Sequence, residues 1–273
     1  MRCFLFFTFS VVFIQASQML NSHEFWIDPT KFIVSQNDMI NANIRVGTKM
    51  KGTAYGYYPR HFKRFEVFSQ KGRLDVSGRL GDKPALSVPP QGNTLVTLIH
   101  ESAENFVTYN EWQKFNEFLI EKDLAEIAKT HLSKKFVKTG FREKYIRYAK
   151  SLVGSGDSQG QDQLHDLEIE FVTQLNPYTS YSETGLPIKL YYKGEPLKKF
   201  QVEIFSQNQD GMIKEDKLVT NNNGLIILKT YPKTKYLLNA VKMREHYLIK
   251  PQKGKNLLLW ESLWGSLTFM TPY

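Results

Sequence analysis

A period of two in the apolar residues is the feature that most restricts the fold of this chain. In segment 39–46, the apolar side chains of Ile40, Ala42, Ile44 and Val46 would share one face of an extended strand. Shorter alternating runs, separated by turn-forming residues, lie at 24–28, 65–69, 73–78 and 94–101. The pattern predicts a β-sandwich in the first part of the chain.

Two segments in the middle of the chain have helical spacing instead. In 111–132, apolar residues recur every three or four positions among charged ones. In 141–153, tyrosines and aliphatic residues fall on one side of a helical projection. The other side carries Lys144, Arg147 and Lys150. We expect amphipathic helices, the second with a solvated basic face, in a helical insertion at about residues 110–153.

Strands return after a glycine-rich loop at 154–163 and continue to the end of the chain. Turn sequences at 194–197 and 221–224 separate several of them. The pattern resembles small Ig-like sandwiches of the transthyretin-like type. We therefore expect a mainly β fold of two β-sandwich units, Ig-like or transthyretin-like. The first spans residues 23–175 and carries the helical insertion, and the second spans 176–273.

The last strand of the second unit is unusually apolar. Trp260, Trp264, Leu267 and Phe269 lie within ten positions, and together they would form a costly patch if exposed. Their spacing predicts that this strand is central to the packing of the molecule.

Residues 1–22 have the form of a secretory signal peptide. Their apolar stretch of about 14 residues is shorter than the roughly 20 that span a bilayer, and no later segment resembles a membrane helix. Cys3 is the only cysteine and would be removed with the signal. We expect an exported, periplasmic protein without disulfides, thiolate metal sites or cysteine nucleophiles.

Charge and motifs exclude several classes of function. Lys and Arg outnumber Asp and Glu by 36 to 27, giving a net charge of +9, but the cations are dispersed, so we expect no nucleic-acid partner. The common hydrolase, zinc-protease and nucleotide-binding motifs are absent, so we expect no enzyme. Asp166, Glu168 and Glu170 alternate as they would on an exposed strand face, and we do not interpret them as an acid/base pair.

His23 is the strongest candidate for a metal ligand. Cleavage after Ser22 would give it a free α-amine, and an amine and an imidazole have ordinary pKa values of about 8 and about 6.5, so both can be neutral near pH 7. Cleavage after Ala16 or Ser17 would instead leave a polar tail ahead of His23. A cut after Leu20 would make His23 the third residue. The other candidate ligands are His61, His100 and His131. The side chain of Glu24 would point to the opposite face of a strand from His23.

The start SHEFWIDP, the segment GFREKYIRYAKSLVGSG and the ending LLLWESLWGSLTF together resemble the bacterial exported DUF4198 family. Members of that family are often labelled as periplasmic components of nickel or cobalt uptake. The resemblance implies that the signal peptide is followed directly by His23, which favours cleavage after Ser22.

Two functions follow from these features. The first is a periplasmic accessory protein that binds nickel, cobalt or copper for an envelope transport component, with His23 as the anchoring ligand. The second is a non-catalytic envelope adaptor that recognises a protein or glycan. Its candidate contact residues are the aromatics Trp26, Tyr55, Tyr57 and Tyr58.

Overall fold

The computed structural model describes residues 23–180, 184–246 and 257–272. The predicted signal peptide and Cys3 lie outside the described residues. Most of the described chain forms β-strands, so the prediction of a mainly β protein is confirmed. Neither of the two α-helices in these ranges has the length and apolar character needed to cross a membrane.

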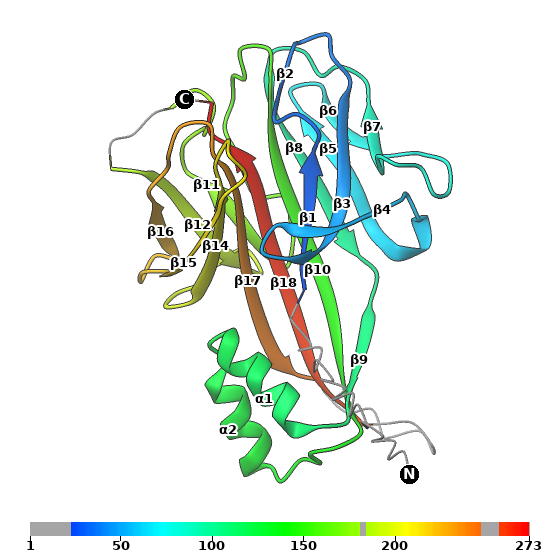
Figure 1. Ribbon diagram of the computed structural model, residues 1–273, viewed down its shortest axis with the longest axis vertical. Helices are drawn as coiled ribbons and strands as arrows, with labels where there is room; N and C mark the ends of the chain where they lie inside the picture. Colours follow the sequence, from blue (N-terminus) through cyan, green and yellow to red (C-terminus); the bar gives the residue numbers. More distant parts are fainter. Residues whose placement is uncertain (1–22, 181–183, 247–256, 273) are drawn as a thin grey trace, which may run out of the picture.

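The largest sheet, called here the central sheet, extends across the molecule (Figure 1). Its main path in the described residues is β15 (Ile213–Val219), β14 (Gln201–Gln207), β17 (Lys235–Glu245), β18 (Leu258–Met270), β10 (Phe141–Ser155), β8 (Thr94–Ser102), β5 (Phe62–Ser69) and β6 (Gly72–Asp75). Two further strands that pair with β10 are β2 (Ile33–Val34) and β9 (Asn105–Tyr109). Along the main path β10 and β18 run parallel, whereas the other neighbours are antiparallel.

Two smaller sheets cover opposite faces of the central sheet. The amino-terminal sheet consists of β1 (Glu24–Pro29), β3 (Ile40–Thr48), β4 (Lys51–Tyr55) and β7 (Leu86–Val88). The carboxyl-side sheet consists of β11 (Ile169–Thr173), β12 (Leu186–Tyr192), β13 (Glu195–Pro196) and β16 (Leu225–Leu228). On β10, Ala149 and Val153 pack under the amino-terminal sheet, while Ile146, Tyr148 and Leu152 pack against the carboxyl-side sheet. Because alternate strand residues point to opposite faces, the middle of the central sheet is buried on both sides.

A pair of helices covers the lower end of the long strands β17 and β18 in Figure 1. The helices are α1 (Trp112–Glu121) and α2 (Ala125–Ser133). Phe115 and Leu119 of α1 pack in one apolar cluster with Trp260 and Trp264 of β18. The amphipathic pattern predicted for 111–132 therefore corresponds to two real helices whose apolar sides are buried.

The segment 141–153, predicted as a helix, is instead part of the strand β10. The prediction is wrong because a strand that is buried on both faces loses its period of two, and its apolar residues then fit a helical spacing equally well. Pairing with β9 and β8 on one edge and with β18 on the other determines the extended conformation. The helical part of the described chain is shorter than predicted and ends at Ser133.

The strand β18 lies in the middle of the central sheet between β10 and β17, which confirms the prediction that the apolar ending is central to packing. It also fastens β1. The hydroxyls of Ser266 and Thr268 donate hydrogen bonds of 2.7 Å to the carbonyls of Phe25 and Ile27. These bonds satisfy backbone acceptors on the edge of β1 that does not pair with β3.

The central sheet passes through both of the units predicted from the sequence. The first unit contributes β10 and the second contributes β18, and these two strands pair over ten residues from each, beginning at Arg142 and Leu258. The predicted boundary near residue 175 therefore does not interrupt the sheet.

Candidate functional site

A cleft of about 410 Å³ lies between the amino-terminal sheet and the central sheet. One wall is formed by residues at the start of β1 and by parts of β3 and β4, and the other by parts of β8, β9 and β10. The short 3-10 helix η1 (Pro59–His61) contributes its last residue. The volume falls in the range of about 300–1,000 Å³ that is typical of small-molecule sites.

Three of the four histidines predicted as metal ligands line this cleft. His23 immediately precedes β1 and is exposed, and its Nδ1 lies 3.2 Å from the Oγ1 of Thr48. His61 is also exposed, and its ring centroid is 5.5 Å from that of Tyr58. His100 comes from β8 and is buried. The fold thus brings together residues that are far apart in the sequence.

The three histidines do not form a preassembled metal centre. Within the described ranges, no three His, Cys, Asp or Glu side chains lie close enough to hold a metal ion together. A metal held in this cleft would therefore have to draw its ligands together on binding.

His100 is enclosed by aromatic rings. Its ring centroid lies 5.0 Å from Phe25, 5.4 Å from Phe62 and 5.1 Å from Phe65. Burial lowers the pKa of His100 to about 3, because a charged imidazole would lose its hydration there. The imidazole is therefore neutral at physiological pH, and its Nδ1 has no hydrogen-bond partner among the described residues.

Arg147 of β10 is a residue of the cleft that the sequence analysis missed. The prediction assigned it to the solvated face of a helix, whereas its guanidinium lies over the rings of Tyr145 and Phe25, 4.9 and 5.6 Å from their centroids. Its backbone N–H donates to the Oγ of Ser102 at 3.0 Å, between the stretches where β10 pairs with β9 and with β8. Interpreting the segment with a period of two would have placed Arg147 and Tyr145 on one face.

A family model described as a domain of unknown function, DUF4198, matches residues 20–244, which include the whole cleft. The chain belongs to the DUF4198 family. A search of curated proteins finds no match for it. The resemblance noted in the sequence is therefore confirmed over most of the chain, while β18 lies beyond the matched residues.

The three segments that carry the resemblance meet in this DUF4198 protein. The start of the described chain forms β1, the middle segment forms β10, and the apolar ending forms β18. β10 and β18 pair directly, and β1 is hydrogen-bonded to β18. His23 also contacts this group of strands, because the Nη2 of Arg147 donates to its carbonyl at 3.4 Å.

His131 lies outside the cleft, on α2, where its side chain is fully buried. The indole N–H of Trp260 donates to its Nδ1 at 3.1 Å, and its Nε2 lies 3.0 Å from the carbonyl of Val137. An Nδ1 that accepts from an indole requires the proton on Nε2, which then donates to the carbonyl. Both ring nitrogens thus have partners, and the structure places His131 in the core of the DUF4198 protein, apart from the candidate ligands His23, His61 and His100.

Glu24 points away from the cleft, as strand alternation predicts. Its carboxylate accepts the backbone N–H of Lys49 at 2.8 Å and lies 4.0 Å from the Nζ of Lys122. Burial raises the pKa of Glu24 to about 7, and the positive charge of Lys122 opposes this shift. Glu24 is therefore not placed to assist His23.

The four aromatic residues proposed for an adaptor do not form one surface. Trp26 and Tyr57 are buried, so they cannot contact a partner. Tyr55 is 46% exposed, and it lines the cleft together with Tyr58. Only these last two remain available for recognition in the DUF4198 protein.

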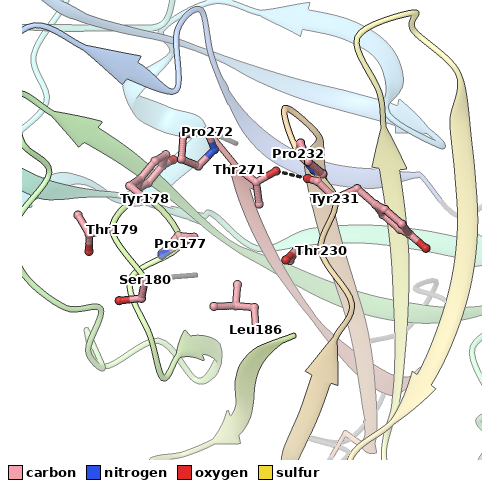
Figure 2. A pocket seen from close by; sticks show the side chains of 10 residues that line it. All are labelled: Pro177, Tyr178, Thr179, Ser180, Leu186, Thr230, Tyr231, Pro232, Thr271 and Pro272. Carbon is pink, nitrogen blue, oxygen red and sulfur yellow. Dashed lines mark hydrogen bonds between the residues drawn. The ribbon is translucent and has the colours of Figure 1, made fainter. Parts of the chain in front are cut away.

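A second, smaller pocket of about 140 Å³ lies between the turn at Pro177 and Tyr178 and the segment that precedes β17 (Figure 2). In Figure 2 a dashed line marks the hydrogen bond that the hydroxyl of Thr271 donates to the carbonyl of Tyr231. The described residues that line the pocket include no histidine, carboxylate or basic side chain. Of these two pockets, only the first cleft therefore contains histidine and arginine side chains, which can bind a metal ion or an anion.

The buried neutral His100 should make the protein sensitive to acid. Below pH 6.5 the unfolded chain takes up a proton on this histidine, whereas the folded protein does not until pH approaches about 3. Stability is thus lost as the pH falls from 6.5 towards 3. At pH 5 the loss from this residue is about 2 kcal/mol relative to pH 7.5.

The variant His100→Phe should lack this part of the pH dependence. Urea unfolding at pH 7.5 and pH 5 measures the free energy of unfolding of both proteins, and contributions from other groups cancel in the comparison. We expect the variant to gain about 2 kcal/mol over the native protein on going from pH 7.5 to pH 5. An equal pH dependence in the two proteins would contradict the neutral state of His100.

Proposed function

We propose that this DUF4198 protein is exported to the periplasm and binds a divalent transition metal as an accessory of an envelope transport component. The observation that carries the proposal is the position of His23, His61 and His100 on one cleft. Imidazole nitrogens of this kind suit nickel, cobalt or copper.

Signal cleavage after Ser22 is part of the proposal. It would give His23 an α-amine beside its imidazole, and the two donors of one residue can chelate an ion without the entropy cost of ordering a loop. His23 is exposed on the cleft. Among the other candidate histidines, His61 is the best third donor, because its imidazole is exposed. His100 is enclosed by aromatic rings, and both ring nitrogens of His131 have hydrogen-bond partners.

The test begins with the intact mass of the exported protein, which we expect to correspond to a chain starting at His23. Nickel is then titrated calorimetrically into this metal-free chain and into a His23→Ala variant with the same cleavage site. We expect the variant to lose at least about 100-fold in affinity, because one residue supplies two donors. Affinity of the native protein should fall below about pH 6, where protons compete for the donors.

Three further variants test whether nickel binding depends on the amine and imidazole of His23. His246→Ala removes an internal histidine outside the cleft and should leave affinity unchanged. His61→Ala should weaken binding, and one glycine inserted before His23 should also weaken it by moving the amine. Equal binding by the native and His23→Ala proteins, or no binding of nickel, cobalt, zinc or copper by either, would overturn the proposal. Tight copper binding alone would not identify the cargo, because copper(II) binds most nitrogen sites best.

The alternative is a non-catalytic envelope adaptor that binds a protein or glycan. Its support is the exposed ring of Tyr55 next to Tyr58 at the cleft, and it replaces the metal proposal if the titrations fail. Under either function we propose a binding role without catalysis, which fits a cleft whose described lining has no carboxylate.

We also propose that the fold consists of two Ig-like sandwich units that share the central sheet. Two separate apolar clusters support this interpretation. One lies between the amino-terminal sheet and β5, β8 and β10, and the other lies between the carboxyl-side sheet and the strands β14, β17 and β18.

A further inference from the structure

The guanidinium of Arg147 lies in the cleft without a counter-ion. Its Nε is buried and has no hydrogen-bond partner, and its Nη2 makes one long hydrogen bond, to the carbonyl of His23. Among the described residues it forms no ion pair. An unpaired cation that is partly removed from water is costly, and such a group is usually matched by an anion.

The nearest acidic residue along the strand does not supply that anion. Glu143 lies four residues before Arg147, and its carboxyl group already accepts hydrogen bonds from the hydroxyls of Tyr109 and Ser262. Burial raises the pKa of Glu143 to about 7, so its negative charge is incomplete at neutral pH. The described residues that line the cleft include neither Asp nor Glu.

Aromatic and aliphatic side chains form much of the lining around Arg147, beside the three histidines, Ser102 and Asn105. The guanidinium lies within cation–π distance of the rings of Phe25 and Tyr145, and all three residues line the cleft. The rest of the lining contains further rings and aliphatic side chains, namely Ile44, Val46, Tyr55, Tyr58 and Phe62. A flat apolar ligand would lose little by leaving water for such a surface.

We propose that the cleft binds a small organic carboxylate with a flat apolar body, whose carboxylate pairs with Arg147. A planar guanidinium recognises a carboxylate through two parallel hydrogen bonds, and that of Arg147 lines a cleft whose described residues offer it no carboxylate. The volume of about 410 Å³ accommodates a ligand of this size. The inference goes beyond metal binding and does not depend on it.

Phenylacetate is a suitable probe, and 2-phenylethanol is its uncharged counterpart with the same ring. Both are titrated calorimetrically into the metal-free mature protein in Tris buffer without phosphate or other carboxylates. We expect phenylacetate to bind with a Kd below about 10 mM, and 2-phenylethanol to bind at least about tenfold more weakly because it cannot form the charged hydrogen bonds. Equal affinities, or no phenylacetate binding at about 10 mM, would overturn the proposal.

Variants on the same strand locate the site. Arg147→Gln should lower phenylacetate affinity at least about tenfold, and Arg147→Lys should lower it less, since it keeps the charge but loses the planar fork. The control is Arg142→Gln, because Arg142 lies on β10 outside the cleft, over the ring of Phe106. Unchanged binding in the folded Arg147→Gln protein would overturn the proposal.

The same titration in the His23→Ala protein separates this inference from the metal proposal. Phenylacetate binding should persist there within about threefold, because His23 offers Arg147 only a backbone carbonyl. If the His23→Ala protein loses metal binding but still binds phenylacetate, the carboxylate site is independent of the His23 metal site. Loss of both in the His23→Ala protein would overturn the independence claimed here.

Discussion

A chain truncated before Asn256 is expected to give no soluble folded protein. It lacks β18, which lies between β10 and β17 and holds β1 through Ser266 and Thr268. Six large apolar side chains of β18 are buried: Leu259, Trp260, Leu263, Trp264, Leu267 and Phe269. At about 1.5–3 kcal/mol each, their contribution is comparable to the whole stability of ~5–15 kcal/mol of a typical domain.

The measurement is soluble yield and circular dichroism of the truncated chain after expression from residue 1. A chain that ends at Thr271 is the control, since it keeps β18 and the hydrogen bonds of Thr271 to the loop before β17. A cooperative thermal transition in the protein truncated before Asn256 would show that the central sheet tolerates the loss of its middle strand.

The second large effect is expected from Lys150→Met, which should destabilise the protein by about 3–5 kcal/mol. The Nζ of Lys150 is buried and lies 2.7 Å from Asp162 and 2.9 Å from Glu170, and it also donates to the carbonyls of Gln163 and Phe171. Removing the cation leaves two buried carboxylates uncompensated, and that is more costly than the loss of the ion pairs themselves.

Urea unfolding at neutral pH measures this change. Lys129→Met is the matched control, because Lys129 is exposed and pairs with Glu126 on the surface, where ion pairs contribute about 0–1 kcal/mol. Adding Asp162→Asn and Glu170→Gln to Lys150→Met removes the stranded charges and should recover part of the loss. A Lys150→Met protein within about 1 kcal/mol of the native one would show that the network is unimportant.

The same network explains where sequence analysis failed. Lys144, Arg147 and Lys150 were assigned to one solvated helix face, but on a strand they point to two faces and meet different surroundings. Lys144 pairs with Glu261, Arg147 lines the cleft and Lys150 is buried. The interpretation of Glu170 as an exposed carboxylate was wrong for the same reason, since its partner Lys150 comes from another sheet.

The features that the sequence predicted correctly depend on residues that are close together in the chain. The alternation in 39–46 predicted β3, and the apolar ending predicted a central strand, because both patterns follow from burial of one strand or one cluster. His23 could be proposed as a ligand from its place directly after the predicted signal peptide. That His61 and His100 share its cleft, and that His131 does not, depends on strand pairing between distant segments, which a single sequence does not reveal.

The hydrogen bonds from Ser266 and Thr268 to β1 join the beginning of the described chain to its end. During synthesis the first strand emerges long before the last one exists, so the middle of the central sheet cannot form until β18 has been made. Such long-range pairing makes folding slow. Until β18 is in place, the carbonyls of Phe25 and Ile27 lack the hydroxyl donors that they have in the folded protein.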